Sequence, residues 1–288
     1  SDPAQHIAPM RPPCQDGVIV FNGLLYWGPW MCGCELSLYG HICLGPEKNS
    51  AAATQNIPPR RTVYTNQLDA VESLADHSAA WPAYRGDQHQ SSTTQIPVPK
   101  QTHPAWSTQV TKSALLTAPV IAGNMIFLAD RSGVIYAYDR EGKLLWKQYT
   151  GGAIFYPPTV SKDRLYAGSA DGRVYAFAAK TGQPLWSFRV APEHRWIPVY
   201  GKLISTWPVA GGVVVHDDTL YAAAGIAHFD VTHLVALDPI TGELKQENNT
   251  SGVLSPTVNS GISLQGSLYI DEGELRFLAG GVYEIARY

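Results

Sequence analysis

The first 43 residues of the chain hold all four of its cysteines, and these side chains are the ones best suited to metal chemistry. Cys14, Cys32, Cys34 and Cys43 lie close in sequence to His41. Thiolate and imidazole groups bind zinc and copper, and a structural zinc site uses four such ligands. An even number of cysteines equally fits two disulfides in an oxidising compartment. Because the Cys-Gly-Cys spacing is tighter than that of usual zinc-ligand pairs, we expect disulfides or buried thiols and keep a metal site as the alternative.

Two pairs of neighbouring residues in the second half of the chain could bind or act on a small molecule. His228 and Asp230 are two positions apart, and a histidine beside a carboxylate can serve as a general base. Arg195 and Trp196 present a guanidinium next to an indole, which could stack on a planar or sugar-like ligand. The structural alternatives are that Trp196 covers a contact between sheets and that His228 and Asp230 cap a turn.

Other motifs associated with catalysis are absent from the sequence. There is no Cys-x-x-Cys-His, so covalent attachment of haem is not supported. The signatures of phosphate-binding loops, zinc proteases and serine hydrolases are also missing. In the stretch WPAYRGDQHQSS we expect Arg85 and Asp87 to contact each other as a structural ion pair.

These candidate residues are carried by a repeat. Stretches that begin at Pro119 and Pro158 each contain four strand-like runs separated by glycine-containing turns, and Trp106, Trp146 and Trp186 follow one another at intervals of forty residues. A third copy begins at Trp207, after an insertion, and a fourth, weaker copy begins at Pro256.

The repeat predicts a stack of four-stranded antiparallel sheets. Runs such as residues 134–138 alternate with period two, which gives each strand two distinct faces. Gly133 and Gly172 supply the positive φ that tight hairpins require. One such sheet cannot bury both faces alone, whereas sheets arranged around an axis cover one another. We therefore predict an all-β fold, a β-propeller in which the recurring tryptophan anchors one blade to the next.

The spacing of Ala137, Asp139, Gly142 and Trp146 resembles the tryptophan-docking motif of quinoprotein-type propellers. This PQQ-repeat family includes PQQ-dependent alcohol dehydrogenases and BamB. The second copy keeps the glycine and the tryptophan at positions 182 and 186, and the third keeps Gly242 but lacks the tryptophan. The stretches at residues 81–92, 116–123, 205–211 and 222–230, with the cysteine-containing segment 11–46, resemble BamB-like proteins of planctomycete-type bacteria.

The resemblance implies a propeller of seven or eight blades that is periplasmic or otherwise extracytoplasmic. It also raises the question of PQQ bound with calcium. The adjacent cysteine pair that is typical of PQQ-dependent alcohol dehydrogenases is missing here. We therefore expect no cofactor, with PQQ and calcium or a cysteine-bound metal as alternatives.

The organisation that we predict is a single propeller domain over residues 1–288. Residues 1–46 form a decorated blade with the cysteines, and residues 47–80 form a connector with a short helix near Leu68 to Asp76. Residues 81–288 form regular blades near 114–150, 153–192, 203–248 and 256–288, with an outer strand at Trp106. The total of about five to six blades suggests a fragment of a longer protein, and no signal peptide is visible.

The charge and hydrophobicity of the sequence exclude two classes of function. The net charge of −3 shows no basic footprint, so we predict no nucleic-acid partner. No apolar stretch is long enough for a membrane span. We predict a non-catalytic extracytoplasmic module that binds or scaffolds a protein, a small molecule or a glycan on its loop face. The alternatives are a PQQ-dependent or metal-assisted oxidoreductase and a carbohydrate-active propeller that uses His228 and Asp230.

Overall fold

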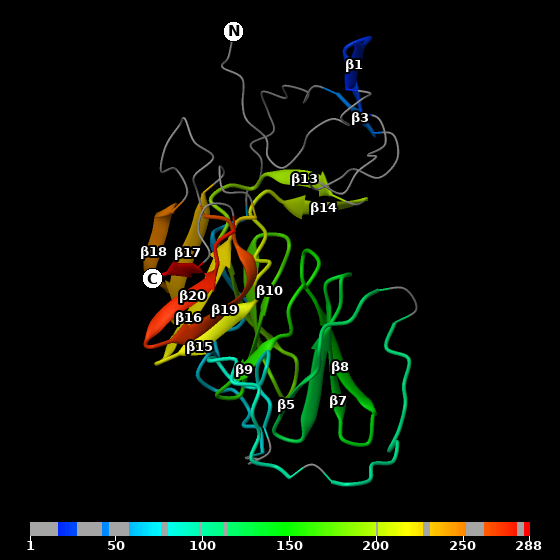
Figure 1. Cartoon of the computed structure of the whole chain (residues 1–288), viewed down its shortest axis with the longest axis vertical. Coiled ribbons are helices and arrows are strands. Elements are labelled where there is room, and N and C mark those ends of the chain that lie inside the picture. The colour runs from blue at the N-terminus through cyan, green and yellow to red at the C-terminus, as the bar shows by residue number, and fades with distance from the viewer. Residues whose placement is uncertain are drawn as a thin grey trace.

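The computed structural model describes residues 17–27, 42–45, 58–75, 80–97, 99–111, 114–199, 201–226, 231–251, 262–280 and 285–288. All regular secondary structure in these residues is β-strand, so the prediction of an all-β fold is confirmed. Figure 1 shows the sheets following one another around the molecule. In the same residues no helix is long and apolar enough to cross a membrane.

Three of the sheets are built as the repeat predicts, and we call each of them a blade. The first blade consists of β5 (Val120–Ala122), β6 (Met125–Ala129), β7 (Val134–Asp139) and β8 (Leu144–Tyr149). The second consists of β9 (Thr159–Ser161), β10 (Arg164–Gly168), β11 (Arg173–Ala178) and β12 (Pro184–Arg189), with β4 (Arg61–Val63) added as a fifth strand. The third consists of β15 (Val213–His216), β16 (Thr219–Ala224), β17 (Thr232–Leu237) and β18 (Leu244–Ser251).

The remaining strands form smaller sheets. A fourth blade contains three described strands, β19 (Gln265–Asp271), β20 (Glu274–Leu278) and β21 (Ile285–Arg287). The insertion between the second and third blades forms a hairpin of β13 (Trp196–Val199) and β14 (Lys202–Ser205). Near the N-terminus β1 (Val18–Phe21), β2 (Leu24–Trp27) and β3 (Ile42–Leu44) form a three-stranded sheet.

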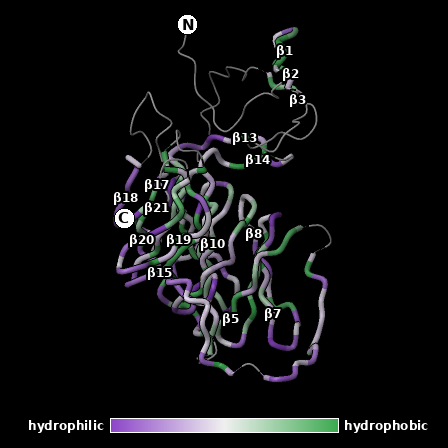
Figure 2. Tube along the Cα trace, in the orientation of Figure 1, coloured by the Kyte–Doolittle hydropathy of each residue, from purple (hydrophilic) through white to green (hydrophobic). Residues whose placement is uncertain are grey.

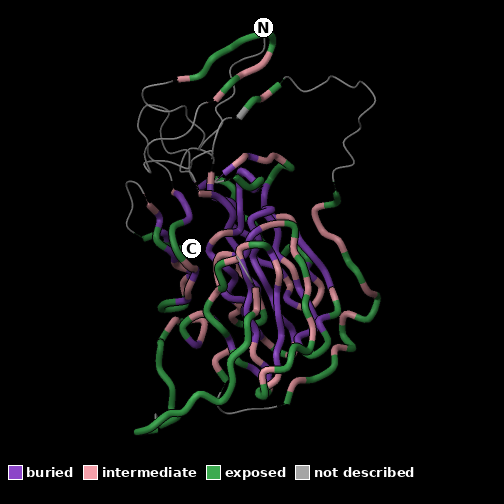
Figure 3. The backbone as a smooth tube through the Cα atoms, turned by 90° about the vertical axis from the view of Figure 1, so that its right-hand side faces the viewer, coloured by how far each residue is buried: buried purple, intermediate pink, exposed green. Residues whose placement is uncertain are grey.

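The first strand of each blade lies nearest to the other blades. β5 contacts β9, β9 contacts β15, and β15 contacts β19, while the later strands of each blade extend outward in chain order. The apolar faces meet in three interfaces, with one cluster between each pair of consecutive blades. Figure 2 shows the hydrophobic residues along these strands, and Figure 3 shows the buried residues gathered at the centre of the molecule.

Tryptophans join consecutive blades, as the sequence predicts. The rings of Trp146 and Trp186 lie against Gly182 and Gly242 of the next blade, and Trp106 lies against Gly142 of the first blade. A Cβ at any of these glycines would come within 2.5 to 2.6 Å of the indole. Each indole N–H also donates to a backbone carbonyl of that blade, at 2.7, 3.0 and 3.3 Å. A side chain at these glycines would therefore force the blades apart.

Two predictions about local structure are wrong. Residues 68–75 contain no helix, and Asp76 lies outside the described residues. The backbone groups that a helix would pair internally are bound by the second blade, because Arg164 donates to the carbonyl of Leu68 and Asp163 accepts from the N–H of Leu74. Trp106 docks on the first blade from residues 99–111, which contain no strand.

Candidate functional site

A pocket of about 200 Å³ lies between the innermost strands β9, β15 and β19. Its wall is completed by residues of the segment 81–90, whose backbone binds several blades. Trp81 exchanges two backbone hydrogen bonds with Ile121, and the N–H of Val160 donates to the carbonyl of Pro82 at 2.8 Å. The N–H of Ile270 donates to the carbonyl of Gln88 at 2.8 Å. One segment thus contacts the first, second and fourth blades and shapes the pocket.

Two tyrosines form the aromatic part of the pocket. The rings of Tyr84 and Tyr156 meet edge to face, with centroids 5.2 Å apart. Burial raises the pKa of Tyr156, and the neighbouring Tyr84 raises it further, despite the opposing effect of Arg131. Tyr156 therefore remains a neutral hydroxyl near neutral pH, able to donate or accept a hydrogen bond.

Asp87 is a carboxylate in the pocket wall, and its oxygens are used by a turn. It accepts hydrogen bonds from the Ser91 hydroxyl at 2.5 Å and from the N–H groups of Ser91 and His89 at 3.1 and 2.9 Å. Burial acts to raise the pKa of Asp87, but these hydrogen bonds outweigh burial and hold it below its ordinary value. Asp87 is therefore an ionised acceptor and is unsuited to act as a general acid.

The predicted contact between Arg85 and Asp87 is wrong. The guanidinium of Arg85 lies over the ring of Tyr84, 5.5 Å from its centroid, while Asp87 binds the turn that follows. Arg85 has a φ of 57° and Gly86 a φ of 102°, so the chain turns between the two side chains. Their short spacing in sequence consequently does not bring them together.

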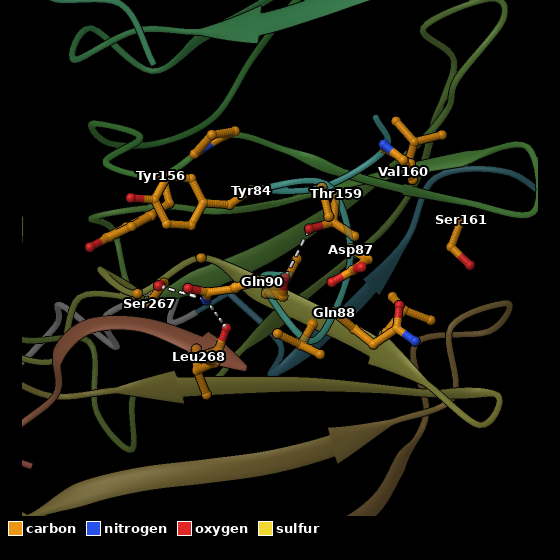
Figure 4. Close-up of a pocket in the computed structure, with 18 residues that line it drawn as sticks. Tyr84, Asp87, Gln88, Gln90, Tyr156, Thr159, Val160, Ser161, Ser267 and Leu268 are labelled. Atoms are coloured by element: carbon orange, nitrogen blue, oxygen red, sulfur yellow. Dashed lines mark hydrogen bonds between the residues drawn. The ribbon is translucent and has the colours of Figure 1, made fainter. Parts of the chain in front are cut away.

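Other polar side chains of the pocket are also held by the protein. The Gln90 side chain donates to the Ser267 hydroxyl at 2.8 Å and to the Leu268 carbonyl at 2.9 Å (Figure 4). The Thr159 hydroxyl donates to the carbonyl of Val213 at 2.9 Å. Among the described residues no group of three or more His, Cys, Asp or Glu side chains could hold a metal ion. Among its described residues the pocket offers tyrosine hydroxyls for binding a polar molecule and pairs no nucleophile with a base.

The structure gives Arg195 and Trp196 different neighbours. The Arg195 guanidinium lies over the ring of Trp207 at 4.5 Å and donates to the hydroxyl of Thr206 at 3.2 Å. The Trp196 indole donates to the His194 ring at 3.2 Å. The two side chains thus do not form one stacking clamp, and their role in ligand binding stays a prediction.

The remaining candidate residues fall almost entirely outside the described part of the chain. These are His228, Asp230, Cys14, Cys32, Cys34 and His41. Cys43 lies in β3 and is exposed. The disulfide, metal and general-base hypotheses therefore stay predictions.

Comparison with known proteins identifies the repeats. Residues 99–286 match the family described as "Outer membrane protein assembly factor BamB". The chain belongs to this family. A BamB of Burkholderia pseudomallei is 34% identical over 121 residues, which are 42% of this chain and 28% of that protein. The quinohemoprotein alcohol dehydrogenase ADH-IIG of Pseudomonas putida is 28% identical over 153 residues, 48% of this chain and 20% of that protein.

Solved structures show the same fold. The quinohemoprotein alcohol dehydrogenase ADHIIG from Pseudomonas putida HK5 superposes with a TM-score of 0.55 at 20% identity, over 69% of this chain and 34% of that one. The prediction of a β-propeller with PQQ-like repeats is thereby confirmed. This BamB-family chain spans less than a third of the length of either relative compared above.

The similarity to a quinoprotein raises the question whether a quinone cofactor and calcium would fit. Calcium takes six to eight oxygen ligands, several of them carboxylates. Among the described residues Asp87 is the single carboxylate that lines the pocket, and a turn already uses its oxygens. The described part of this BamB-family pocket therefore does not fit a calcium-bound quinone.

Proposed function

We propose that this chain is a non-catalytic, protein-binding propeller that works outside the cytoplasm as a scaffold in outer-membrane protein assembly. Relatives named as outer membrane protein assembly factors support a role in this process and, with it, a location outside the cytoplasm. We include in the proposal that residues 1–288 form a single propeller domain. The observation that carries the non-catalytic assignment is a pocket whose carboxylate and Gln90 amide are already hydrogen-bonded within the protein, with no catalytic pair among its described residues.

The hairpin of β13 and β14 is the part of the loop face that we assign to partner binding. Its inner side is fixed, because Ile197, Val199 and Ile204 are buried in a cluster with Ala153, which lies between the first two blades, and Ala170 of the second blade. Lys202 also donates to the carbonyl of Arg131 at 2.7 Å. On its outer side Leu203 is 64% exposed. A seated hairpin that exposes a leucine offers a rigid apolar contact to a partner.

The test is site-specific photo-crosslinking in the envelope of the source organism. A photoreactive residue replaces Leu203, and a matched control replaces the exposed Asp217 in the turn between β15 and β16. We expect position 203 to form adducts that mass spectrometry identifies as components of the outer-membrane assembly machinery. Adducts of equal yield at both positions, or none at 203, would contradict the proposal.

The oxidoreductase alternative is tested separately. The sequence similarity to a quinohemoprotein alcohol dehydrogenase favours it, and the pocket chemistry opposes it. We expect no saturable PQQ binding and no dye-linked alcohol oxidation after reconstitution with PQQ and calcium. The carbohydrate-active alternative depends on His228 and Asp230, and no observation in the described residues favours it.

A further inference from the structure

The second blade carries an extra strand that the sequence repeat does not contain. Residues 58–75, which we call the strap, place β4 antiparallel on the outer edge of β12. The N–H of Tyr64 donates to the carbonyl of Leu185 at 2.9 Å, and the N–H of Arg189 donates to the carbonyl of Arg60 at 2.7 Å. A segment from elsewhere in the chain thus completes the edge of a blade by strand addition.

Side chains of the strap fix it on the second and third blades. Arg60 forms an ion pair with Glu247 of β18, and Arg61 donates to the carbonyl of Thr241 at 2.7 Å. Leu68 and Val71 pack against the buried cluster that contains Leu185. The strap therefore combines ladder hydrogen bonds, charge pairing and apolar cover.

The outer edge of β8 has the same repeat position in the first blade but no such cover. Leu145 is forty residues before Leu185, and it is 44% exposed where Leu185 is 1% exposed. Tyr149, which corresponds to Arg189, is 58% exposed. No described strand pairs with this edge of β8.

The outer edge of β18 in the third blade shows that an open edge need not be apolar. Its sequence is LKQENNTS, and apart from Leu244 its residues are polar. Exposed polar residues protect an open edge from pairing, whereas exposed leucine and tyrosine favour it. Of the first three blades, the first is thus the one whose outer edge is both open and suited to receive a strand.

The charges around β8 differ from those that hold the strap. Arg60 and Arg61 of the strap pair with Glu247 and Glu243 of the third blade. The corresponding residues of the second blade, beside β8, are the neutral Gln183 and Ser187. Lys143 and Lys147 are exposed on the first blade at this edge. An added strand that carries carboxylates would complement these lysines.

We propose that the outer edge of β8 is a docking site for an extended segment of a partner protein, which adds as a fifth strand as β4 does on β12. The segment carries acidic side chains toward Lys143 and Lys147 and apolar side chains toward Leu145. That the occupant is a protein rests on the proposed function. The site itself is defined by the repeat geometry.

The experiment uses the full chain and a labelled peptide with the sequence of residues 58–72 in which Arg60→Glu and Arg61→Glu are introduced. We expect saturable binding by fluorescence anisotropy, weaker binding of the unaltered strap peptide, and weakening by salt. In the second blade the N–H of Arg189 donates to the strap, and the N–H of Tyr149 is its equivalent in β8. Tyr149→Pro removes this N–H and should weaken peptide binding about tenfold. Asn249→Pro at the same position of β18 is the matched control and should bind normally.

A second variant distinguishes a lost binding site from a misfolded protein. Lys147→Glu changes an exposed side chain, so it should preserve the thermal unfolding profile while reversing the preference between the two peptides. Binding that survives both Tyr149→Pro and Lys147→Glu, or an absence of binding to the wild-type chain, would overturn the proposal. Self-association that Tyr149→Pro abolishes would assign the edge to a second copy of the chain and also overturn it. None of these outcomes affects the crosslinking test at Leu203.

Discussion

Trp146 of the first blade lies against Gly182 of the second, so closely that a Cβ on the glycine would come within 2.6 Å of the indole. Gly182 also has a φ of 74°, which side chains other than glycine adopt at a cost. The glycine is thus required both by its own turn and by the tryptophan of its neighbour.

The first prediction separates these two requirements. Gly182→Ala should lower the free energy of unfolding by roughly 2 to 4 kcal/mol, because it adds overpacking to backbone strain. Gly273→Ala is the control, since Gly273 has a φ of 82° and nothing within 4 Å of a new Cβ. It should cost only about 1 kcal/mol. Urea denaturation measures both, and equal losses would show that the ring contact contributes little.

The tryptophans should differ in how much they contribute to the free energy of unfolding, although they occupy the same repeat position. Trp186 is fully buried, while Trp106 is 39% exposed and docks from a segment without strand structure. Trp186→Ala should cost about 3 to 5 kcal/mol, and Trp106→Ala clearly less. Thermal unfolding of the two variants gives the order directly. The reverse order would mean that residues 99–111 hold the first blade more firmly than burial indicates.

Much of the fold could be predicted from the repeat because blades depend on local alternation and turns. The forty-residue spacing of the tryptophans predicted that they anchor one blade to the next, but the glycines at positions 142 and 182 that they contact became evident only in the structure. The strap could not be predicted in this way. β4 has three residues and gains its stability from β12, more than 120 positions away, and from Glu247.

The pocket could not be predicted from the sequence, for a related reason. Residues 81–92 stood out as a family-like stretch, but their role depends on hydrogen bonds to Ile121, Val160 and Ile270 in three blades. The spacing of Arg85 and Asp87 indicated a contact that the turn between them prevents. Long-range pairing, rather than side-chain type, determines which groups line this pocket.

Alkaline pH should weaken the first blade through Tyr136. Burial and the hydrogen bond from its hydroxyl to Asp130 at 3.0 Å raise the pKa of Tyr136 to about 12. Because the folded-state pKa lies above the ordinary value of about 10, the stabilisation is complete below pH 10 and is lost as the pH rises toward 12. Tyr136→Phe should cost about 1 kcal/mol at neutral pH and flatten this decline. Unfolding curves from pH 8 to 12 are the measurement, and a decline as steep in the variant would point to other groups.

The last prediction concerns the strap and its effect on β12. Hydrogen exchange should be much slower in β12 than in β8. The reason is that β4 binds the outer edge of β12, whereas no described strand binds the outer edge of β8. Tyr64→Pro removes the N–H that donates to Leu185, so β12 should exchange nearly as fast as β8. Tyr64→Ala keeps this N–H and loses only the side chain with its hydrogen bond to Ser187, so it should retain most of the protection. Mass spectrometry of peptides covering residues 144–149 and 184–189 compares the two edges within one sample. If β12 stays protected in Tyr64→Pro, its protection comes from the third blade, and strand addition by the strap is not what distinguishes the two edges.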